Sequence, residues 1–297
     1  MPAVLCVGIA TLDHVFAVAT LPTKPEKHRA HDLAVVGGGI AANAAVAVAR
    51  LGGRAALAAR LGADGTAEII LDELAREGVD CALARRFPGL RSPTSAVLVD
   101  ARGERLVVSY SDPETPADPA WLPARLGSEV GAVLGDTRWP EGTAHLFRLA
   151  RAAGIPAVLD ADRRPDPDLL ALATHVAFAE QALREVTGSP DPAAGLAALA
   201  GSARNWLAVT VGDRGVLFLE RGRVAGAPAF AVDAVDTLAA GDAWHGAFAL
   251  ALAEGRGERA AIRFASAAAA IKCTRFGGRA GLPSRAEVDA FLMERGG

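Results

Sequence analysis

Cysteine is scarce in this sequence, which has three among 297 residues. Cys6, Cys81 and Cys273 lie far apart, so their spacing matches neither a structural metal site nor the framework of a disulfide-rich domain. This usage is typical of proteins in the reducing cytoplasm, where we expect the chain to be located.

The sequence also lacks a strong charge of one sign and a long apolar run. Its formal net charge is −3, which provides no overall attraction to nucleic acid or to an anionic membrane, so we expect neither as a partner. The apolar runs are far shorter than the roughly 20 residues of a membrane span. The opening MPAVLCVGIATLDHV has no basic segment and is interrupted by Asp13, which favours a first strand over a signal peptide.

Apolar strands alternate with amphipathic helices along most of the chain. Hydrophobic residues make up 51% of the sequence, which is enough for a sizeable core. The alternation predicts an α/β fold with a mostly parallel sheet between helices, in one domain spanning residues 1–297. Segments 14–36 and 91–112 break this order, and we expect them to form a small antiparallel sheet that acts as a lid.

A glycine run stands out in VVGGGIAANAAVAVARLGG, where Gly37, Gly38 and Gly39 precede a helical stretch. The run fits G-x-G-x-x-A, the dinucleotide-binding fingerprint of flavin and nicotinamide oxidoreductases. That fingerprint should leave the first strand of its unit, but a strong strand already lies at 3–10. The next strand ends near Arg60 and offers no acid for the ribose, although Arg60 is compatible with the 2′-phosphate of NADP. An oxidoreductase therefore stays open as an alternative.

A second small-residue turn, in VDTLAAGDAWHGAF, has the stronger physical case for holding a phosphate. Ala239, Ala240 and Gly241 lead directly into a predicted helix, so backbone N–H groups are free at its positive end. Asp242 lies at the same helix start, where a carboxylate serves either as a capping group or as a general base.

The motifs resemble those of the PfkB, or ribokinase-like, family of carbohydrate kinases. DTLAAGDAWHGAF is similar to the family signature D-T-x-G-A-G-D, and GGGIAANAAVAVARLG to its glycine-asparagine signature. RLGADGTAEIILDELAREGVD and VTVGDRGVLFLERG resemble two further family segments, in family order. The resemblance implies a three-layer α/β/α fold and transfer of the γ-phosphate of ATP to a primary hydroxyl of a sugar. The family has no Walker A sequence, and none occurs here.

The resemblance also assigns roles to individual residues. Asp242 matches the catalytic base, and the backbone of Ala239, Ala240, Gly241 and Asp242 matches the anion hole. The positions that contact the sugar match Asp13, Gly38, Gly39 and Asn43. The positions near ATP match Thr210, Gly212 and Gly215. Some members form a homodimer through the lid, and we expect the same here.

Two metal ions follow from the same resemblance. Mg²⁺ is expected with ATP, because it bridges the β- and γ-phosphate oxygens. The family motif N-x-x-E is replaced by Ala179 and Ala182, so the adjacent Glu180 is the candidate for organising the metal's water ligands. Asp236 either orders its loop or joins the K⁺ site found in some members.

Within the family, the chain is most similar to the sulfofructose kinase subgroup, which phosphorylates 6-deoxy-6-sulfofructose at its C1 hydroxyl. Lys27 and Arg138 match two sulfonate-binding positions, and Ser109 stands where the subgroup has asparagine. Arginine and lysine suit a compact oxyanion, yet Lys27 and Arg138 would also be ordinary as a solvated lysine and a surface ion-pair residue. The Ser109 difference leaves a different acidic sugar or plain fructose open as the substrate, with ribose and 2-keto-3-deoxygluconate as further alternatives.

Overall fold

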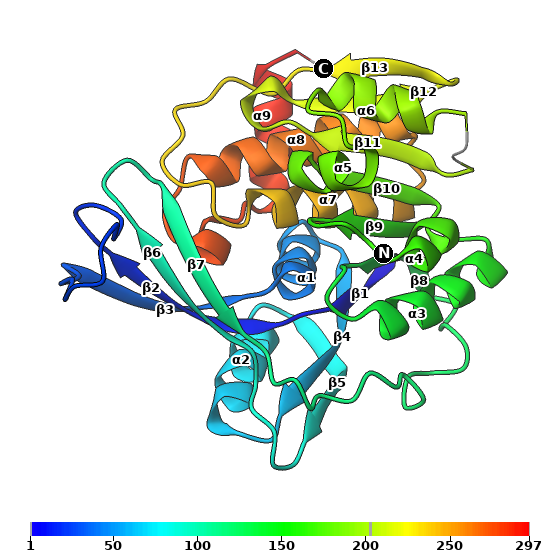
Figure 1. Ribbon diagram of the computed structural model, residues 1–297. Coiled ribbons are helices and arrows are strands. Elements are labelled where there is room, and N and C mark those ends of the chain that lie inside the picture. The colour runs from blue at the N-terminus through cyan, green and yellow to red at the C-terminus, as the bar shows by residue number, and fades with distance from the viewer. Residues whose placement is uncertain (1, 202–203, 297) are drawn as a thin grey trace.

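The computed structural model describes residues 2–201 and 204–296, which form a large sheet covered by helices and a small projecting sheet (Figure 1). Across the described large sheet the strands are, in order, β13 (Arg223–Ala227), β12 (Val216–Glu220), β11 (Trp206–Thr210), β10 (His175–Ala179), β9 (Ala157–Ala161), β8 (Val130–Gly135), β1 (Ala3–Gly8), β4 (Arg54–Gly62) and β5 (Val79–Phe87). Neighbouring strands run parallel from β11 to β5, whereas β11–β12 and β12–β13 are antiparallel. The prediction of a mostly parallel sheet is confirmed.

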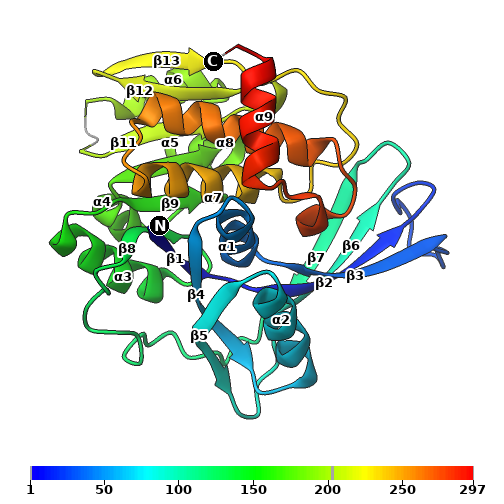
Figure 2. The ribbon, with the colours of Figure 1, turned by 180° about the vertical axis from the view of Figure 1, so that it is seen from behind.

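Helices cover both faces of this sheet and give the three predicted layers. One face carries α1 (Ile40–Arg50), α2 (Gly65–Arg76), α7 (Ala240–Ala253), α8 (Glu258–Cys273) and α9 (Arg285–Glu294), seen in Figure 2. The other carries α3 (Pro140–Ala153), α4 (Pro167–Leu172), α5 (Glu180–Thr187) and α6 (Pro192–Leu199). Strand β1 explains why: its residues are buried throughout, with Val4 and Cys6 in one core and Leu5 and Val7 in the other.

The small sheet has the strand order β3 (Asp32–Gly38), β2 (Thr11–Ala17), β6 (Thr94–Val99) and β7 (Arg105–Tyr110). Its strands fall close to the predicted lid segments, but β2 already begins at Thr11. The middle pair, β2 and β6, is parallel, and both outer pairs are antiparallel. Figure 1 shows this sheet, hereafter the lid, projecting from one side of the main body.

Strand register divides the lid into two faces of different character, because side chains alternate between them. Asp13 pairs with Ser95, which pairs with Ser109, so these polar side chains belong to one face. The row next to it, on the opposite face, contains Val35, His14, Ala96 and Val108.

Two short 3₁₀ segments, η1 (Gly212–Arg214) and η2 (Gly278–Gly281), follow β11 and α8. Cys6, Cys81 and Cys273 are all free thiols. Within residues 2–201 and 204–296, no helix is long and apolar enough to cross a membrane.

Candidate active site

The small-residue turn before α7 forms a strained helix start. Ala239 is the N-cap and takes a left-handed conformation with φ 63°. A residue with a Cβ pays about 1–2 kcal/mol there, and such strain is concentrated at functional sites. The N–H groups of the first helical turn lie at the positive end of the helix dipole. Ala240, Gly241 and Asp242 therefore form the first turn of α7, as an anion hole requires.

Asp242 lies in that first turn and points back toward α1. Its Oδ2 accepts a 2.6 Å hydrogen bond from Nδ2 of Asn43. Burial and the nearby carboxylate of Asp160 raise the pKa of Asp242 to about 7, against the opposing effects of Asn43 and His245. A carboxyl group with a pKa near the working pH is well suited to accept and release a proton.

His245, one turn along α7, is a buried cation beneath this carboxyl group. Its Nδ1 lies 2.8 Å from the carbonyl oxygen of Gly241 and 2.9 Å from Oδ2 of Asp160, and its Nε2 lies 3.3 Å from the carbonyl oxygen of Ala177. All three partners are acceptors, so both ring nitrogens must carry a proton. Burial acts to lower the pKa of His245, but Asp160 and the hydrogen bonds raise it to about 9. The imidazolium thus balances one carboxylate close to Asp242.

Gly38 and Gly39, which are predicted to contact the sugar, lie so close to neighbouring groups that no side chain would fit there. A Cβ on Gly38 would lie 1.9 Å from Oδ2 of Asp13, so only glycine lets Asp13 occupy its position. Gly39 has φ +91°, and a Cβ there would lie 2.5 Å from the carbonyl oxygen of Ile9. The structure therefore brings Asp13, Gly38 and Gly39 together, beside the helix that carries Asn43.

Arg279 completes this cluster and was missed by the sequence analysis. The guanidinium is buried and donates from Nε to Oδ1 of Asn43 and from Nη2 to the carbonyl oxygen of Gly38, both at 2.9 Å. Its Nη1 pairs with Glu73 at 3.3 Å. Asn43 thus links Arg279 to Asp242, so protein groups already use part of the hydrogen-bonding capacity predicted for sugar hydroxyls.

Asp136, just beyond β8, is a second group that the sequence analysis missed. Its Oδ2 accepts from the N–H groups of Ile9 (2.8 Å) and Ala41 (3.3 Å), and its Oδ1 from that of Arg138 (2.8 Å). Burial raises the pKa of Asp136 to about 6, although these backbone N–H groups oppose the rise. The carboxylate ties the end of β1 to the start of α1 and holds the segment that carries Arg138.

The three residues predicted to recognise an anionic group occupy different environments. The Arg138 guanidinium pairs with Asp162 through Nη2, while its buried Nε has no hydrogen-bond partner among the described residues. Ser109 is exposed on β7, in register with Ser95 and thus on the face that carries Asp13. Lys27 is exposed in the loop between β2 and β3.

The residues predicted to lie near ATP line one cavity with the anion-hole turn. This cavity has a volume of about 490 Å³. Its lining includes Thr210, Gly212, Gly215, Ala240 and Gly241. Its apolar lining includes Val216, Phe230, Val232 and Trp244. An apolar cavity that ends at a helix N-terminus suits a flat base joined to phosphates.

Glu180, the predicted metal-organising residue, begins α5 and is exposed. Its Oε2 pairs with Nη2 of Arg214 at 2.6 Å; Arg214 is the last residue of η1 and precedes Gly215. Among the described residues, no cluster of three or more acidic, histidine or cysteine side chains could hold a metal ion by itself.

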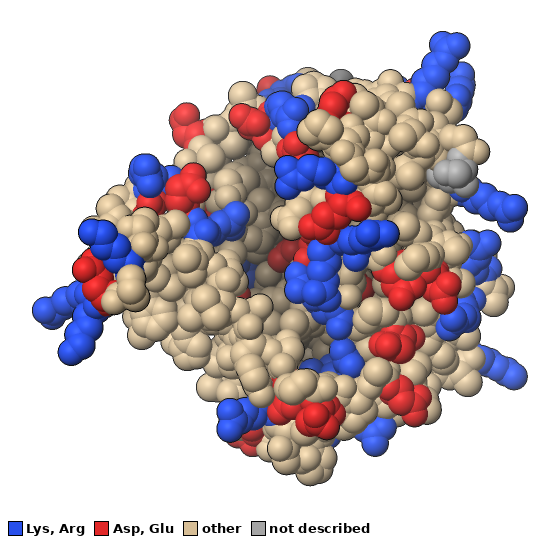
Figure 3. All heavy atoms as spheres, viewed as in Figure 1, with Lys and Arg blue, Asp and Glu red and all other residues tan. Residues whose placement is uncertain are grey.

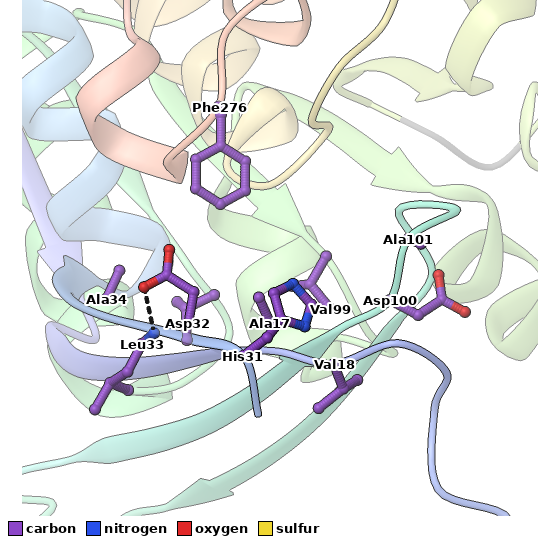
Figure 4. A pocket seen from close by; sticks show the side chains of 11 residues that line it. Ala17, Val18, His31, Asp32, Leu33, Ala34, Val99, Asp100, Ala101 and Phe276 are labelled. Carbon is purple, nitrogen blue, oxygen red and sulfur yellow. Dashed lines mark hydrogen bonds between the residues drawn. The ribbon is translucent and has the colours of Figure 1, made fainter. Parts of the chain in front are cut away.

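The surface is hollowed between the lid and the main body on the face shown in Figure 3, where acidic and basic side chains lie along the rim. Toward the outer end of the lid, a pocket of about 300 Å³ is lined by lid residues such as Val15, Ala17 and His31. Phe276, in the segment after α8, faces them across the pocket (Figure 4). Val15 and Ala17 lie on the same face of β2 as Asp13, so the lid face that carries Asp13 is turned toward the main body.

The dinucleotide interpretation of the glycine run does not fit this geometry. Gly37 and Gly38 end β3, an edge strand of the small sheet, which is mixed and not antiparallel throughout as predicted, and only then does α1 begin. A dinucleotide fingerprint joins a strand of a parallel sheet to its helix. The glycines instead make close contact with Asp13 and Arg279.

A sequence signal existed for some of the residues that were missed. Asp136 and Asp160 lie at or just beyond the ends of apolar strands, in VLGD and VLDAD, where open parallel sheets bind their ligands. His245 shares the motif of Asp242, but its partners on β9 and β10 are distant in sequence. Arg279 gave no signal beyond its position in a glycine-rich loop.

Known proteins show the same arrangement along the whole chain. The family model described as pfkB family carbohydrate kinase matches residues 1–285. The chain is 29% identical to a ribokinase of Bacillus subtilis over 98% of its own length and 100% of that protein. It is 34% identical to a fructokinase of Klebsiella pneumoniae over 70% of its length and 74% of that protein.

A solved structure agrees with these sequence relationships. A protein of Agrobacterium tumefaciens, assigned provisionally as a ribokinase, superimposes with a TM-score of 0.90 at 39% identity, covering 99% of this chain and 98% of that one. The fold is thus ribokinase-like, and the predicted resemblance is confirmed. The chain belongs to the pfkB family of carbohydrate kinases, phosphotransferases that use ATP to phosphorylate a sugar.

Proposed function

We propose that the chain phosphorylates the C1 hydroxyl of 6-deoxy-6-sulfofructose. The observation that carries this choice is Arg138, whose buried Nε has no acceptor among the described residues. A buried N–H donor without a partner costs about 1–3 kcal/mol, and a sulfonate oxygen would supply the acceptor. Lys27, on the lid loop, adds a second positive charge. Ser109, on the face of Asp13, adds a hydroxyl.

The positions of the described groups support the following reaction. Asp13 and the Gly38–Gly39 backbone bind the hydroxyls of the sugar, and Asp242 accepts the proton of the attacking hydroxyl. The sugar oxygen forms a bond to the γ-phosphorus while the bond to the β–γ bridging oxygen breaks, and ADP leaves. The N–H groups at the start of α7 stabilise charge on the transferring phosphoryl group.

The nucleotide would lie in the 490 Å³ cavity, with its phosphates at the start of α7. Mg²⁺ bound to the nucleotide would neutralise phosphate charge. Glu180 is joined to the Gly212–Gly215 turn through its ion pair with Arg214, and its carboxylate would orient water on that ion. We keep it as the candidate metal-organising residue.

The test is ADP release measured with sulfofructose, fructose, ribose and 2-keto-3-deoxygluconate. We expect the highest kcat/KM with sulfofructose. Arg138→Met should lower that value by about ten- to a hundredfold, the worth of a charged hydrogen bond, with little effect on fructose. Arg148→Met, at an exposed position on α3, is the matched control. A preference for fructose or ribose, or an equal loss on both sugars, would refute the assignment of the substrate.

We further propose that the chain forms a homodimer through the lid. The lid face opposite Asp13 carries exposed apolar side chains, including Leu33, Val35, Val108 and Tyr110. Val35 and Val108 are 50% and 62% exposed, which is unusual for valines grouped on one sheet face. A second copy of the same apolar surface would match it in polarity, as in a twofold dimer.

A further inference from the structure

Lys272 is a fully enclosed lysine at the end of α8, and its side chain is 0% exposed. It is the last but one residue of the helix and lies beside the segment that leads to the anion hole. Lysine is almost never fully buried unless it is paired. The burial of the charged Lys272 side chain therefore needs a structural or functional explanation.

Three oxygen atoms surround the ammonium group. Nζ donates to the carbonyl oxygen of Asp236 at 2.8 Å, to Oδ2 of the same residue at 3.0 Å, and to the carbonyl oxygen of Arg275 at 3.2 Å. An ammonium has three protons, so each proton has an acceptor. Backbone carbonyl and carboxylate oxygens are also the atoms that replace the hydration shell of a metal cation.

The same oxygens connect two segments of the active site. Asp236 accepts from the N–H of Leu238, which precedes the anion hole, and from the N–H groups of Gly277 and Gly278. Gly278 begins the short η2 segment, which also contains Arg279. A cation beside Asp236 therefore fixes the position of the anion-hole turn relative to the segment that contains Arg279.

We propose that the ammonium of Lys272 takes the place of a monovalent metal ion at Asp236, so that this kinase needs no K⁺. A potassium ion bound to the Asp236 carboxylate and these two carbonyl oxygens would need the position that Nζ already fills. The residues present thus do not fit the K⁺ site that the family resemblance left open at Asp236. The effect on rate rests on the proposed kinase function, whereas the effect on stability does not.

The first test compares KCl, NaCl and choline chloride at equal ionic strength on the unaltered protein. We expect the same rate of ADP release and the same thermal unfolding midpoint in all three salts. A rate several times higher in KCl than in choline chloride, or a midpoint raised by KCl alone, would overturn the proposal. This test uses only the unaltered protein, so its result does not depend on whether a variant of Lys272 folds.

The second test removes the ammonium with Lys272→Met, which keeps most of the unbranched stem. In choline chloride we expect at least a tenfold loss of rate and a lower unfolding midpoint, both partly restored by KCl. Lys24→Met, in an exposed loop, is the matched control and should respond to neither salt. If Lys272→Met keeps the original rate and midpoint, or if KCl restores neither, Lys272 does not replace a metal ion. The midpoint needs no sugar or ATP, so it separates this failure from that of the proposed function.

Discussion

At the scale of single residues, the ionisation of Asp242 depends on burial and on charges of both signs. Burial, then Asp160, raise its pKa, and Asp162 adds to the rise. Asn43 and His245 act in the opposite direction, and the resulting pKa is about 7. Because a base must be ionised to accept a proton, activity should depend on pH in the neutral range.

We expect kcat/KM of the free enzyme to fall as the pH drops below about 7. His245→Asn removes the positive charge and leaves Asp160 uncompensated, so the pKa of Asp242 should rise. The acidic limb of the kcat/KM profile should then move to higher pH, by about one pH unit or more. Activity lost at neutral pH should be regained at alkaline pH.

The control for this profile is His145→Asn, because His145 bonds the carbonyl oxygen of Pro123 at 2.9 Å and has no part in the described site. Its acidic limb should match that of the unaltered enzyme. A uniform loss of activity in His245→Asn, with no movement of the limb, would show that His245 acts only through packing.

The same carboxyl group should affect stability with a definite sign. Its pKa in the folded protein, about 7, lies above the ordinary value of 3.8. The folded state therefore binds the proton more tightly, and this stabilisation is fully present below pH 3.8 and lost as the pH rises through about 7. Asp242→Asn should raise the unfolding midpoint at alkaline pH by on the order of a few °C, and not at acidic pH. An equal difference at both pH values would contradict the raised pKa.

A substitution at Gly38 tests the predicted sugar-binding residues. Gly38→Ala places a Cβ 1.9 Å from Oδ2 of Asp13 and must displace that carboxylate. We expect a higher KM for the sugar, by about tenfold or more for a lost charged hydrogen bond, with the KM for ATP little changed. Gly65→Ala is the matched control, because a Cβ there meets nothing within 4 Å. A raised KM for ATP instead would place Gly38 on the nucleotide side.

At the scale of elements, the sequence predicted those whose pattern is local and strong. Strand β1 lies within the apolar run at 3–10, and α7 begins in the small-residue turn where a helix start was predicted. Strand β5 was not predicted, because only part of it is apolar and it ends in Arg85, Arg86 and Phe87 at the sheet edge. The short α6 was also missed, since eight residues carry too little periodicity to identify a helix.

The apolar lid face makes a prediction at this scale. Val35→Asp puts a charge in the middle of the proposed dimer contact, so sedimentation at micromolar concentration should change from dimer to monomer. Asp32→Asn lies on the other face of the same strand and should leave the dimer intact. A monomeric unaltered protein would exclude the proposed interface.

At the scale of the whole molecule, the site forms where segments distant in sequence meet at one edge of the parallel sheet. The predicted anion-hole turn and Asp242 could be singled out from the sequence because they belong to one local motif. The bond between Arg279 and Asn43 spans 236 residues, and that between Asn43 and Asp242 spans 199, so no local pattern could reveal either. The same holds for Lys272, which meets Asp236 only because α8 packs against α7.

The central claim is that Asp242 is the base of an ATP-dependent sugar kinase. The most direct test is turnover of Asp242→Asn in the ADP-release assay, with ATP binding followed by the fluorescence of Trp244, which lines the nucleotide cavity. We expect a loss of turnover of about 10²–10⁴-fold with ATP binding retained. Turnover equal to that of the unaltered protein would exclude Asp242 as the base.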